Sequence, residues 1–545
     1  AIPTGGGAAA LACGNTVLFK PSPLAFPLGA EIAKCFWDAG IPREALQLVC
    51  CENGEPIQTL SGHPDVDAII FTGGTQTALK LLEKRPDAEL SAETGGKNAT
   101  IVTAMADRDQ TVEHVLHSAF SHSGQKCSAT SLLVLEKEVY EDETFRKQLL
   151  DAIQTLKVGS VWNFSNKMGP LIREPLENLR RGLETLEDGE SWALQPKCDE
   201  RNLKLWHPAV KWGVKRGSFS HQTEFFGPLL SVMKAESLDD AIEIVNDTNY
   251  GLTSGLESLD PREQKIWSEK IKAGNLYINR VTTGAIVLRQ SFGGMGLSAI
   301  GAGIKAGSPN YAVQFCRIEE SKPYGDSPTQ GPLREESPLL YLARNWQTQL
   351  TRNEHAEIRS ELQKTIEAIY SCLYQYEREF SGEQDFFRLR GQDNLFRYLP
   401  IGKVTVRMHP DDGLVETVIR IAAARIAKCK VEISLPPDLN NSVTEFLAGT
   451  DGKHLCDSVE ILTENDENLA DRILVTDPPS KIDRVRYALP NRVPQVIHQA
   501  AAKLGKHISR HVPLAEGRIE MLRYLREQSI SVDYHRYGNL GEREL

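Results

Sequence analysis

Short apolar strands alternate with helices along the first half of this chain of 545 residues, and that alternation constrains the fold more than any other feature. The apolar run Val66 to Thr72 ends at Gly73-Gly74, and a helix-like segment follows over Thr75 to Glu83. The run Thr16 to Phe19 is likewise followed by a helix-like segment. Strands that alternate with helices form a parallel sheet covered on both faces. We therefore expect an α/β fold with ligands at the carboxyl ends of the strands, where Lys20 and Gly73-Gly74 fall.

The length predicts about three or four domains. A hydrophobic content of 41% with 25% charged residues is ordinary for a globular protein, and the net charge of −11 argues against a nucleic-acid surface. No apolar run approaches 18 residues, so no transmembrane helix is expected. The ten cysteines have no metal-ligand spacing, which favours a reduced cytoplasmic protein without a metal site. The first residues lack an initiator methionine and a signal peptide, so we expect a fragment.

Two short motifs carry the candidate chemistry. Cys127 lies among small residues in Ser123 to Ala129, and Glu93 precedes a glycine pair in Ala92 to Asn98. A thiol nucleophile and a carboxylate base on two glycine-containing segments suit acyl-enzyme chemistry on an aldehyde. In this order and at this spacing the motifs resemble the aldehyde dehydrogenase superfamily. The resemblance implies that Cys127 attacks the aldehyde and that Glu93 activates water, with Lys126 and backbone N–H groups favouring the thiolate; a buried structural thiol is the alternative for Cys127.

The cofactor elements of that family have counterparts here, although the G-x-G-x-x-G fingerprint is absent. Gly14 to Ser22 resembles the family's G-N-T-V-x-x-K-P-S element, Phe71 to Thr75 its F-T-G-S element, and Glu224 to Pro228 its E-x-F-G-P motif. The resemblance implies binding of NAD, with contacts to the adenosine ribose, the pyrophosphate and the nicotinamide ribose. The residues concerned are Lys20, Ser22, Gly73, Gly74, Glu224 and Phe226. Pro23 stands where many NAD-preferring relatives have an acid, which leaves NADP open.

A subfamily resemblance concerns the substrate. Ser291 to Gly294 and Lys305 to Tyr311 read like dehydrogenases that oxidise L-glutamate γ-semialdehyde, the hydrolysed form of 1-pyrroline-5-carboxylate. Backbone N–H groups of a glycine loop and a serine hydroxyl suit the α-carboxylate of such a substrate. The implied substrate-binding residues are Lys126, Ser128, Phe292, Gly307 and Ser308. Another semialdehyde, such as succinate semialdehyde, is the alternative substrate.

The start of the chain and the Glu93 motif look most like the bacterial bifunctional proline utilisation A proteins, in which a proline dehydrogenase domain with FAD lies upstream. The N-F-P asparagine of the family's oxyanion hole would precede Ala1. Losing one such donor costs about 10²–10³ in rate, so we expect this chain alone to be impaired. In the family, the segment that corresponds to 312–317 often pairs as a strand with another subunit, which implies a homo-oligomer.

The sequence divides into four segments. Residues 1–95 are assigned to an incomplete NAD-binding domain, 96–300 to the catalytic domain, 301–338 to the substrate-anchor loop, an oligomerisation strand and a linker, and 339–545 to a Rossmann-like α/β domain.

In the last segment, apolar residues at helical spacing predict a long helix over 358–376. We also predict strands over 472–476 and 530–534 and a helix over 516–527. No Cys/Glu pair or phosphate loop occurs there, so a structural role at the active-site cavity or a subunit interface is expected, with a small-molecule site at His535 and Arg536 as the alternative. A non-catalytic scaffold remains the alternative for the chain.

Overall fold

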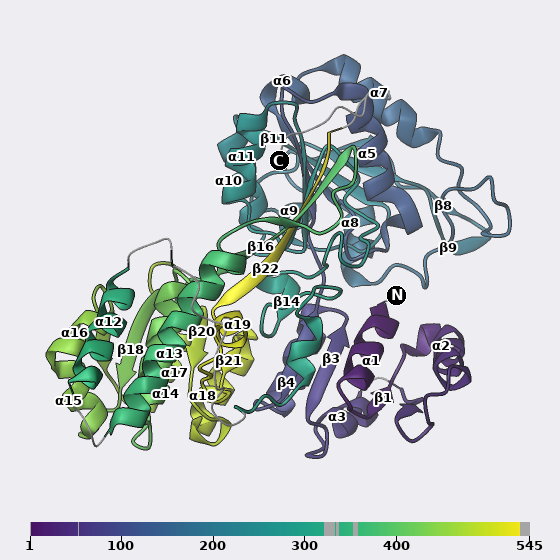
Figure 1. Ribbon diagram of the computed structural model, residues 1–545. Helices are drawn as coiled ribbons and strands as arrows, with labels where there is room; N and C mark the ends of the chain where they lie inside the picture. The colour runs from purple at the N-terminus through teal and green to yellow at the C-terminus, as the bar shows by residue number, and fades with distance from the viewer. Residues whose placement is uncertain (1, 53, 321–332, 334–336, 353–357, 535–545) are drawn as a thin grey trace.

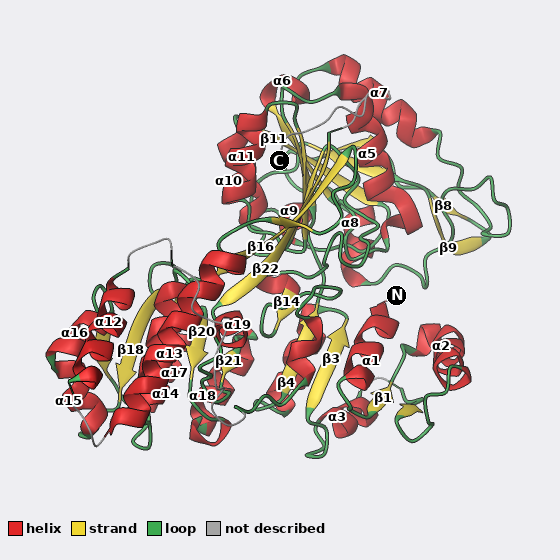
Figure 2. Ribbon diagram, in the orientation of Figure 1, coloured by secondary structure: helices red, strands yellow, loops and turns green. Residues whose placement is uncertain are grey.

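The computed structural model describes residues 2–52, 54–320, 333, 337–352 and 358–534. Its main sheets lie in three bodies, which we call the N-terminal, central and C-terminal units (Figure 1). The central unit contains a ten-stranded sheet and the C-terminal unit a five-stranded sheet, while the N-terminal unit contains one sheet of two strands and one of three. Helices and strands alternate in each unit, which confirms the α/β class (Figure 2). None of the described helices combines the length and apolar character needed to cross a membrane.

The N-terminal unit has two separate small sheets rather than one continuous sheet. Strands β1 (Val17–Phe19) and β2 (Leu46–Leu48) pair in parallel. In the other sheet, β4 (Glu89–Glu93) lies between β3 (Ala68–Thr72) and the short strand β14 (Ala299–Ile300). The helices of this unit are α1 (Ile2–Ala12), α2 (Phe26–Asp38), α3 (Glu55–Ser61) and α4 (Thr75–Lys84).

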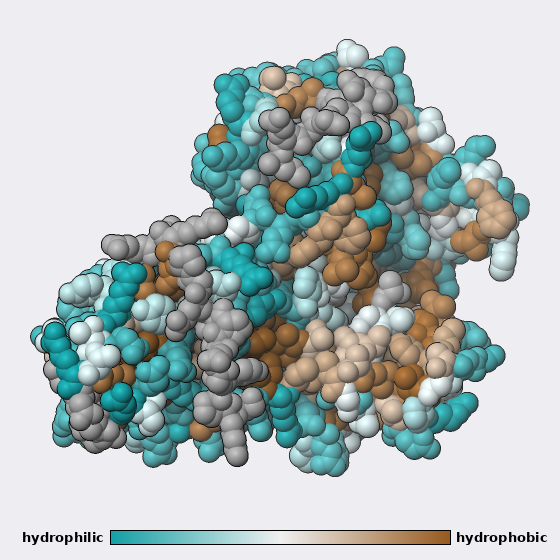
Figure 3. Space-filling view, viewed as in Figure 1, coloured by the Kyte–Doolittle hydropathy of each residue, from teal (hydrophilic) through white to brown (hydrophobic). Residues whose placement is uncertain are grey.

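Large apolar side chains are exposed on the N-terminal unit. Figure 3 shows them gathered below the junction with the central unit, over α1 and β3. Ile70 of β3 is 41% exposed and Leu18 of β1 is 45% exposed. Within the described part of the chain, each of these strands pairs with another strand on one side only, so each lies at a sheet edge.

The central sheet is mostly parallel and is covered by helices on its faces (Figure 2). Strand β6 is buried from Leu132 to Leu135, as expected for a parallel strand with both faces covered. The parallel strands of this part of the sheet are β5 (Ala99–Val102), β6 (Leu132–Glu136), β10 (Ala209–Trp212), β11 (Leu229–Ala235), β12 (Thr253–Glu257) and β13 (Asn275–Ile278), with β7 (Ser191–Leu194) antiparallel at one edge. The two neighbours of β6 are β5 and β11. The main flanking helices are α5 (Arg108–Phe120), α7 (Glu143–Gln154), α10 (Leu238–Asn246) and α11 (Pro261–Lys270).

Two long strands from the last third of the chain complete this sheet. Strand β22 (Leu525–Asp533) pairs in parallel with β13, and β16 (Gln392–Pro400) pairs antiparallel with β22. In Figure 1 both strands span the distance between the C-terminal and central units. The two-residue strand β15 (Gln384–Asp385) then forms the edge. The C-terminal segment is therefore built into the central sheet rather than attached beside it.

The C-terminal unit has five parallel strands packed between helices. The strands are β17 (Lys403–Arg407), β18 (Lys430–Leu435), β19 (Glu460–Thr463), β20 (Arg484–Arg486) and β21 (Ile508–Ser509), and the main helices are α12 (Pro338–Thr351), α13 (Arg359–Gln375), α14 (Leu414–Ile426), α17 (Asp466–Ile473) and α18 (Gln495–Leu504). The predicted helix over 358–376 corresponds to α13, whose Leu362, Ile366 and Ile369 are buried in the core.

Three local predictions are wrong. Residues 472–473 end helix α17 instead of starting a strand, because Leu469 and Ile473 bury one helical face. Residues 525–527, predicted as helix, begin β22. The segment predicted as an oligomerisation strand over 312–317 contains a 3₁₀ helix, Tyr311–Phe315, which lies against α1. Most of the predicted linker, together with His535 and Arg536, lies outside the described residues.

Candidate active site

Cys127 lies on a tightly folded loop between α5 and β6. The backbone is left-handed at His122, Ser123 and Gly124, with φ of 56°, 55° and 69°. A Cβ atom on Gly124 would lie 2.2 Å from the carbonyl oxygen of Gly227, so only glycine fits there. The thiol is half-buried rather than sealed in the core. The loop therefore holds Cys127 in one place with a partly accessible sulfur.

Asn98 holds this loop in position. Its Nδ2 donates to the carbonyl oxygens of Cys127, at 2.6 Å, and Ala129, at 3.0 Å. Its Oδ1 accepts from the backbone N–H of Thr253, at 3.0 Å. Asn98 stands within the Glu93 motif, and no role for it was predicted from the sequence.

Glu93 is the last residue of β4, and its carboxylate is close enough to Cys127 for the two charges to interact. Glu93 Oε2 accepts a hydrogen bond of 2.9 Å from the N–H of Gly294. Burial raises the pKa of Glu93 to about 7, against the opposing effects of Lys305 and the Gly294 N–H. A carboxylate with a pKa near neutrality is suited to act as a general base.

The surroundings of Cys127 disfavour its thiolate. Burial, then Glu93 and Glu224, raise the pKa of the thiol to about 11, while the backbone N–H groups of Cys127 and Ser128 lower it. Lys126, expected to assist the thiolate, donates from Nζ to Ser121 Oγ at 3.3 Å. At neutral pH Cys127 is therefore a protonated thiol that needs a base.

Glu224 is the second carboxylate that acts on the Cys127 thiol. Its Oε1 accepts a hydrogen bond of 2.8 Å from the N–H of Gly96. A Cβ atom on Gly95 would lie 1.9 Å from Glu224 Oε2, so the glycine pair makes room for this carboxylate. Burial raises the pKa of Glu224, and Lys97 opposes that shift. Phe226, two residues on, is 44% exposed.

The predicted pyrophosphate element lies near Glu224. Gly74 is the N-cap residue of α4 without a side-chain cap, and nothing lies within 4 Å of a Cβ atom built on it. Burial and Glu224 raise the pKa of Tyr250, whereas its hydrogen bond with Thr75 lowers it, so Tyr250 lies between the start of α4 and Glu224. Lys20 and Ser22 follow β1 in the separate two-stranded sheet.

The predicted substrate residues Phe292, Gly307 and Ser308 are brought together by backbone pairing. Phe292 and Ala306 exchange hydrogen bonds of 2.9 and 3.0 Å as an isolated antiparallel bridge. Gly307 has φ of 74°, which favours glycine. The Ser308 hydroxyl donates to Glu527 Oε1 at 3.1 Å. Ser128 is buried next to Cys127, where its carbonyl oxygen accepts from Thr282 Oγ1 at 3.1 Å.

Two buried charged residues near this site were missed. Lys305, 2% exposed, interacts electrostatically with Glu93 and Glu527. Glu527, 3% exposed, comes from β22 at the far end of the chain. Lys305 is the first residue of the predicted substrate motif Lys305 to Tyr311, so the sequence could have indicated it as a site residue. No local sequence signal marks Glu527 as one.

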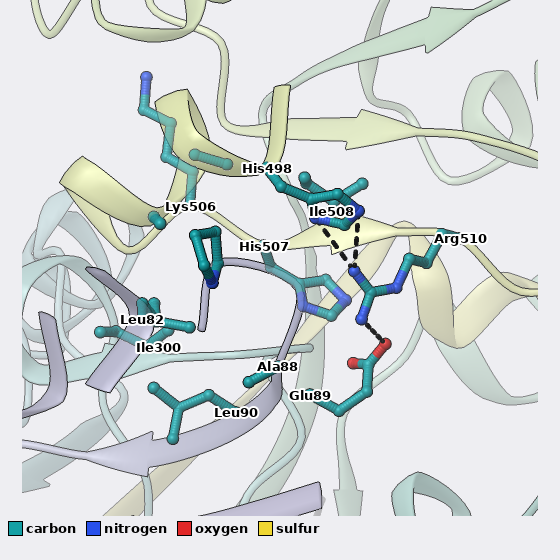
Figure 4. Close-up of a pocket in the computed structure, with 13 residues that line it drawn as sticks. Leu82, Ala88, Glu89, Leu90, Ile300, His498, Lys506, His507, Ile508 and Arg510 are labelled. Carbon is teal, nitrogen blue, oxygen red and sulfur yellow. Dashed lines mark hydrogen bonds and ion pairs between the residues drawn. The ribbon is translucent and has the colours of Figure 1, made fainter. Parts of the chain in front are cut away.

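A small cavity of about 30 Å³ lies elsewhere, between β4 and α4 of the N-terminal unit and α18 and β21 of the C-terminal unit (Figure 4). Arg510 lies at its wall, with an ion pair to Glu89 at 2.7 Å and a contact to His498 Nδ1 at 3.2 Å. None of the predicted site residues lines it. Within the described part of the chain, no group of three or more metal-ligating side chains occurs.

Residues 1–320 match the sequence profile of the Aldehyde dehydrogenase family. The chain belongs to the aldehyde dehydrogenase family. The match ends before the C-terminal unit begins, so it covers the region that contains Cys127, Glu93 and Glu224.

Individual relatives are more specific. Over 324 residues the chain is 33% identical to 1-pyrroline-5-carboxylate dehydrogenase of Bacillus subtilis, covering 57% of this chain and 62% of that protein. The structure of Proline Utilization A from Corynebacterium freiburgense is similar over 98% of this chain and 49% of its own, with 36% identity and a TM-score of 0.80. A Thermus 1-pyrroline-5-carboxylate dehydrogenase with bound NAD has a TM-score of 0.52 and 34% identity, over 56% of this chain and 60% of its own. The chain thus spans about half to three fifths of the length of these relatives.

Proposed function

We propose that this chain catalyses the NAD-dependent oxidation of L-glutamate γ-semialdehyde, formed by hydrolysis of 1-pyrroline-5-carboxylate, to L-glutamate. The observation that carries the proposal is the convergence of Cys127 and Glu93, with Glu93 having a pKa of about 7. A nucleophile and a base close enough to interact are the minimum for acyl-enzyme chemistry. The similarity to proteins named 1-pyrroline-5-carboxylate dehydrogenase supports this substrate over succinate semialdehyde.

Cys127 starts the reaction. Since its thiol is protonated at neutral pH, Glu93 accepts the proton as the sulfur attacks the aldehyde carbon. The C–S bond forms as the carbonyl π bond opens, which gives a thiohemiacetal whose oxygen faces the Cys127 N–H. Loss of hydride from that carbon leaves a thioester on Cys127.

The residues present fit NAD. The uncapped N–H groups at the start of α4 suit the pyrophosphate, and Gly74 leaves space for it. Glu224 Oε2 is the acceptor for the ribose hydroxyls, and Lys20 and Ser22 are assigned to the adenosine end. When bound, NAD supplies the hydride acceptor. We assign NAD rather than NADP as the cofactor because the similar Thermus structure contains bound NAD.

Glu93 acts again in the second half of the reaction. After it has released the thiol proton to solvent, Glu93 is again a carboxylate and takes a proton from water. The hydroxide oxygen bonds to the thioester carbon, and the C–S bond breaks to release L-glutamate and the Cys127 thiolate. The Gly294 N–H holds Glu93 Oε2, which leaves Oε1 to face the water.

The substrate's α-carboxylate is assigned to the Gly307 loop. The N–H of Gly307 has no acceptor among the described residues. The hydroxyl of its neighbour Ser308 donates its proton to Glu527 and accepts from the Asn310 N–H. It can therefore accept a hydrogen bond from the substrate's α-ammonium but cannot donate one to the α-carboxylate. Phe292 on the bridged strand lines the aliphatic part of the pocket.

The wider context is also a proposal. The similarity over 98% of this chain to Proline Utilization A supports a bifunctional parent whose upstream proline dehydrogenase domain uses FAD and supplies the substrate. We also propose a cytoplasmic homo-oligomer.

The test is NADH formation with 1-pyrroline-5-carboxylate and, separately, with succinate semialdehyde. We expect a kcat/KM at least about tenfold higher for the α-amino acid semialdehyde. Equal or reversed values would assign the chain to another semialdehyde. NAD binding without oxidation of either compound would favour a scaffold.

A further inference from the structure

The carboxylate of Glu527, in the C-terminal segment, accepts several hydrogen bonds from the predicted substrate-anchor loop. Glu527 Oε2 accepts from the backbone N–H of Lys305 at 2.6 Å. Glu527 Oε1 accepts from Asn310 Nδ2 at 2.7 Å and from Ser308 Oγ at 3.1 Å. Three donors from one six-residue loop therefore end on one buried carboxylate, which fixes the loop's shape around Gly307.

The same loop reaches Glu93 through the side chain of Lys305. Lys305 Nζ donates to the carbonyl oxygen of Gly293, and the N–H of the same Gly293–Gly294 peptide donates to Glu93 Oε2. An ammonium on the carbonyl polarises a peptide and makes its N–H a stronger donor. Lys305 thus acts on Glu93 through one shared peptide group.

Packing leaves little freedom in this connection. A Cβ atom on Gly293 would lie 2.7 Å from Glu93 Oε1 and 3.1 Å from Lys305 Cγ. A Cβ atom on Gly274, at the start of β13, would lie 2.3 Å from Lys305 Nζ. The path from Glu527 to Glu93 is therefore closely packed as well as hydrogen-bonded.

Other residues of the last third of the chain brace the far end of the loop. Asn310 Nδ2 also donates to the Tyr398 hydroxyl at 2.8 Å, and Asn310 Oδ1 accepts from Arg518 at 2.6 Å. Tyr398 lies on β16, the neighbour of β22 in the central sheet. The anchor loop is consequently held from strands that the family profile does not cover.

We infer that Glu527 is a positioning residue that sets the substrate-anchor loop and, through Lys305 and the Gly293–Gly294 peptide, the orientation of Glu93. The part that concerns the substrate rests on the proposed function, whereas the part that concerns the loop does not. Glu527 itself need not touch substrate, because its oxygens are taken by the loop donors.

The test compares Glu527→Gln with Glu520→Gln. The first keeps the side-chain shape but replaces an acceptor oxygen with an amide that cannot accept from the loop donors. The second changes another buried glutamate, bound to Arg486 and Tyr524 away from the loop, and controls for a general loss of stability. The measurements are backbone hydrogen exchange over residues 293–310, binding of L-glutamate, and KM for the semialdehyde and for propanal, which has no carboxylate.

We expect Glu527→Gln to speed exchange in this segment at least about tenfold and to raise the L-glutamate Kd and the semialdehyde KM by a similar factor, with a change in the propanal KM of less than about twofold. Glu520→Gln should leave all four within about twofold. If the Glu527 variant does not fold, Asn310→Ala removes one of the three donors and should give the same pattern more weakly.

The inference would be overturned if hydrogen exchange over residues 293–310 in Glu527→Gln matched that of the unmodified chain. It would also be overturned if the KM values for the semialdehyde and for propanal rose by the same factor. Failure of the proposed function looks different: the unmodified chain would neither bind L-glutamate nor prefer the semialdehyde, while the loop would still loosen in Glu527→Gln.

Discussion

Burial, together with two nearby carboxylates, raises the pKa of the Cys127 thiol. Glu93 and Glu224 each raise the pKa of the thiol, in addition to the effect of burial, and the two backbone N–H groups lower it only in part. The thiol is thus inert until a base or a bound ligand changes its surroundings. A resting thiol of this kind is protected from oxidation, because the thiolate is the reactive form.

This arrangement predicts that Glu93→Gln accelerates alkylation of Cys127 by iodoacetamide. Removing the negative charge eliminates a cause that raises the pKa of the thiol, so the thiolate fraction at pH 8.5 should rise by about tenfold for one pKa unit. The rate is measured by mass spectrometry of the Cys127 peptide. Glu138→Gln, at an exposed position of the short helix α6 (Lys137–Tyr140), is the matched control. Slower alkylation in Glu93→Gln would mean that Glu93 already deprotonates the resting thiol.

The sequence alone predicted the role of a site residue only where the neighbouring residues in the chain form a recognisable motif. Cys127 and Glu93 stand in short motifs whose residue types identify them, and their proximity agrees with the resemblance. The raised pKa of the thiol could not be predicted, because it depends on how deeply the loop is buried and on Glu224. Glu527 lies 222 positions from Lys305, so its role appears only once β22 is placed.

Strand β22 couples the last third of the chain to the central sheet. It covers the edge of β13 that would otherwise carry unpaired backbone groups. Ile530 is 4% exposed and packs with Leu276 and Ile278 of β13 in the core of the central unit. The stability of the central unit therefore depends on a strand that follows the whole C-terminal unit.

We expect Ile530→Ala to destabilise the central unit by about 2–4 kcal/mol, from lost apolar burial and the cavity left behind. The measurement is urea unfolding followed by tryptophan fluorescence, with Trp267 and Trp212 reporting on this unit. Leu203→Ala, on the exposed strand β9 (Asn202–Trp206), should change stability by less than about 0.5 kcal/mol. Equal effects of the two changes would show that β22 contributes nothing to the central unit.

The elements that the sequence predicted well are those with a clear period. Helix α13 lies within a residue or two of the predicted segment. Where the apolar residues are few, tertiary contacts decide: residues 525–527 read as helix from composition, yet they pair with β16. Likewise, 3₁₀ hydrogen bonds and contact with α1 replace the strand expected over 312–317.

At the scale of the whole molecule, a buried arginine, Arg510, links the N-terminal and C-terminal units through an ion pair and a hydrogen bond. His498 of α18 accepts from Arg510, which in turn pairs with Glu89 of β4 (Figure 4). Burial, then Arg510, lower the pKa of His498 from 6.5 to about 4. The neighbouring His507 has its pKa lowered in the same sense by burial and by arginines.

This contact predicts a loss of stability in acid. Below about pH 6.5 His498 is protonated in the unfolded chain, whereas in the folded chain it stays neutral down to about pH 4. The free energy of unfolding therefore falls as the pH is lowered from about 6.5 to about 4. The full effect for one such histidine is about 3 kcal/mol. His498→Gln should flatten the decrease in unfolding midpoint between pH 7 and pH 5, measured by thermal denaturation, whereas His63→Gln on the surface should not. An unchanged pH dependence of the unfolding midpoint in His498→Gln would show that this histidine does not cause the loss of stability in acid.

The most direct test of the central claim is to trap the acyl-enzyme. Intact-protein and peptide mass spectrometry are applied to Glu93→Gln and Cys127→Ser after incubation with 1-pyrroline-5-carboxylate and NAD. Acylation can still proceed in Glu93→Gln, because loss of the Glu93 charge lowers the pKa of the Cys127 thiol. If Cys127 is the nucleophile and Glu93 the base for hydrolysis, Glu93→Gln therefore accumulates a glutamyl thioester on the Cys127 peptide, with one NADH for each adduct, and Cys127→Ser forms neither. NADH formation by Cys127→Ser, or an adduct on a different cysteine, would contradict the account.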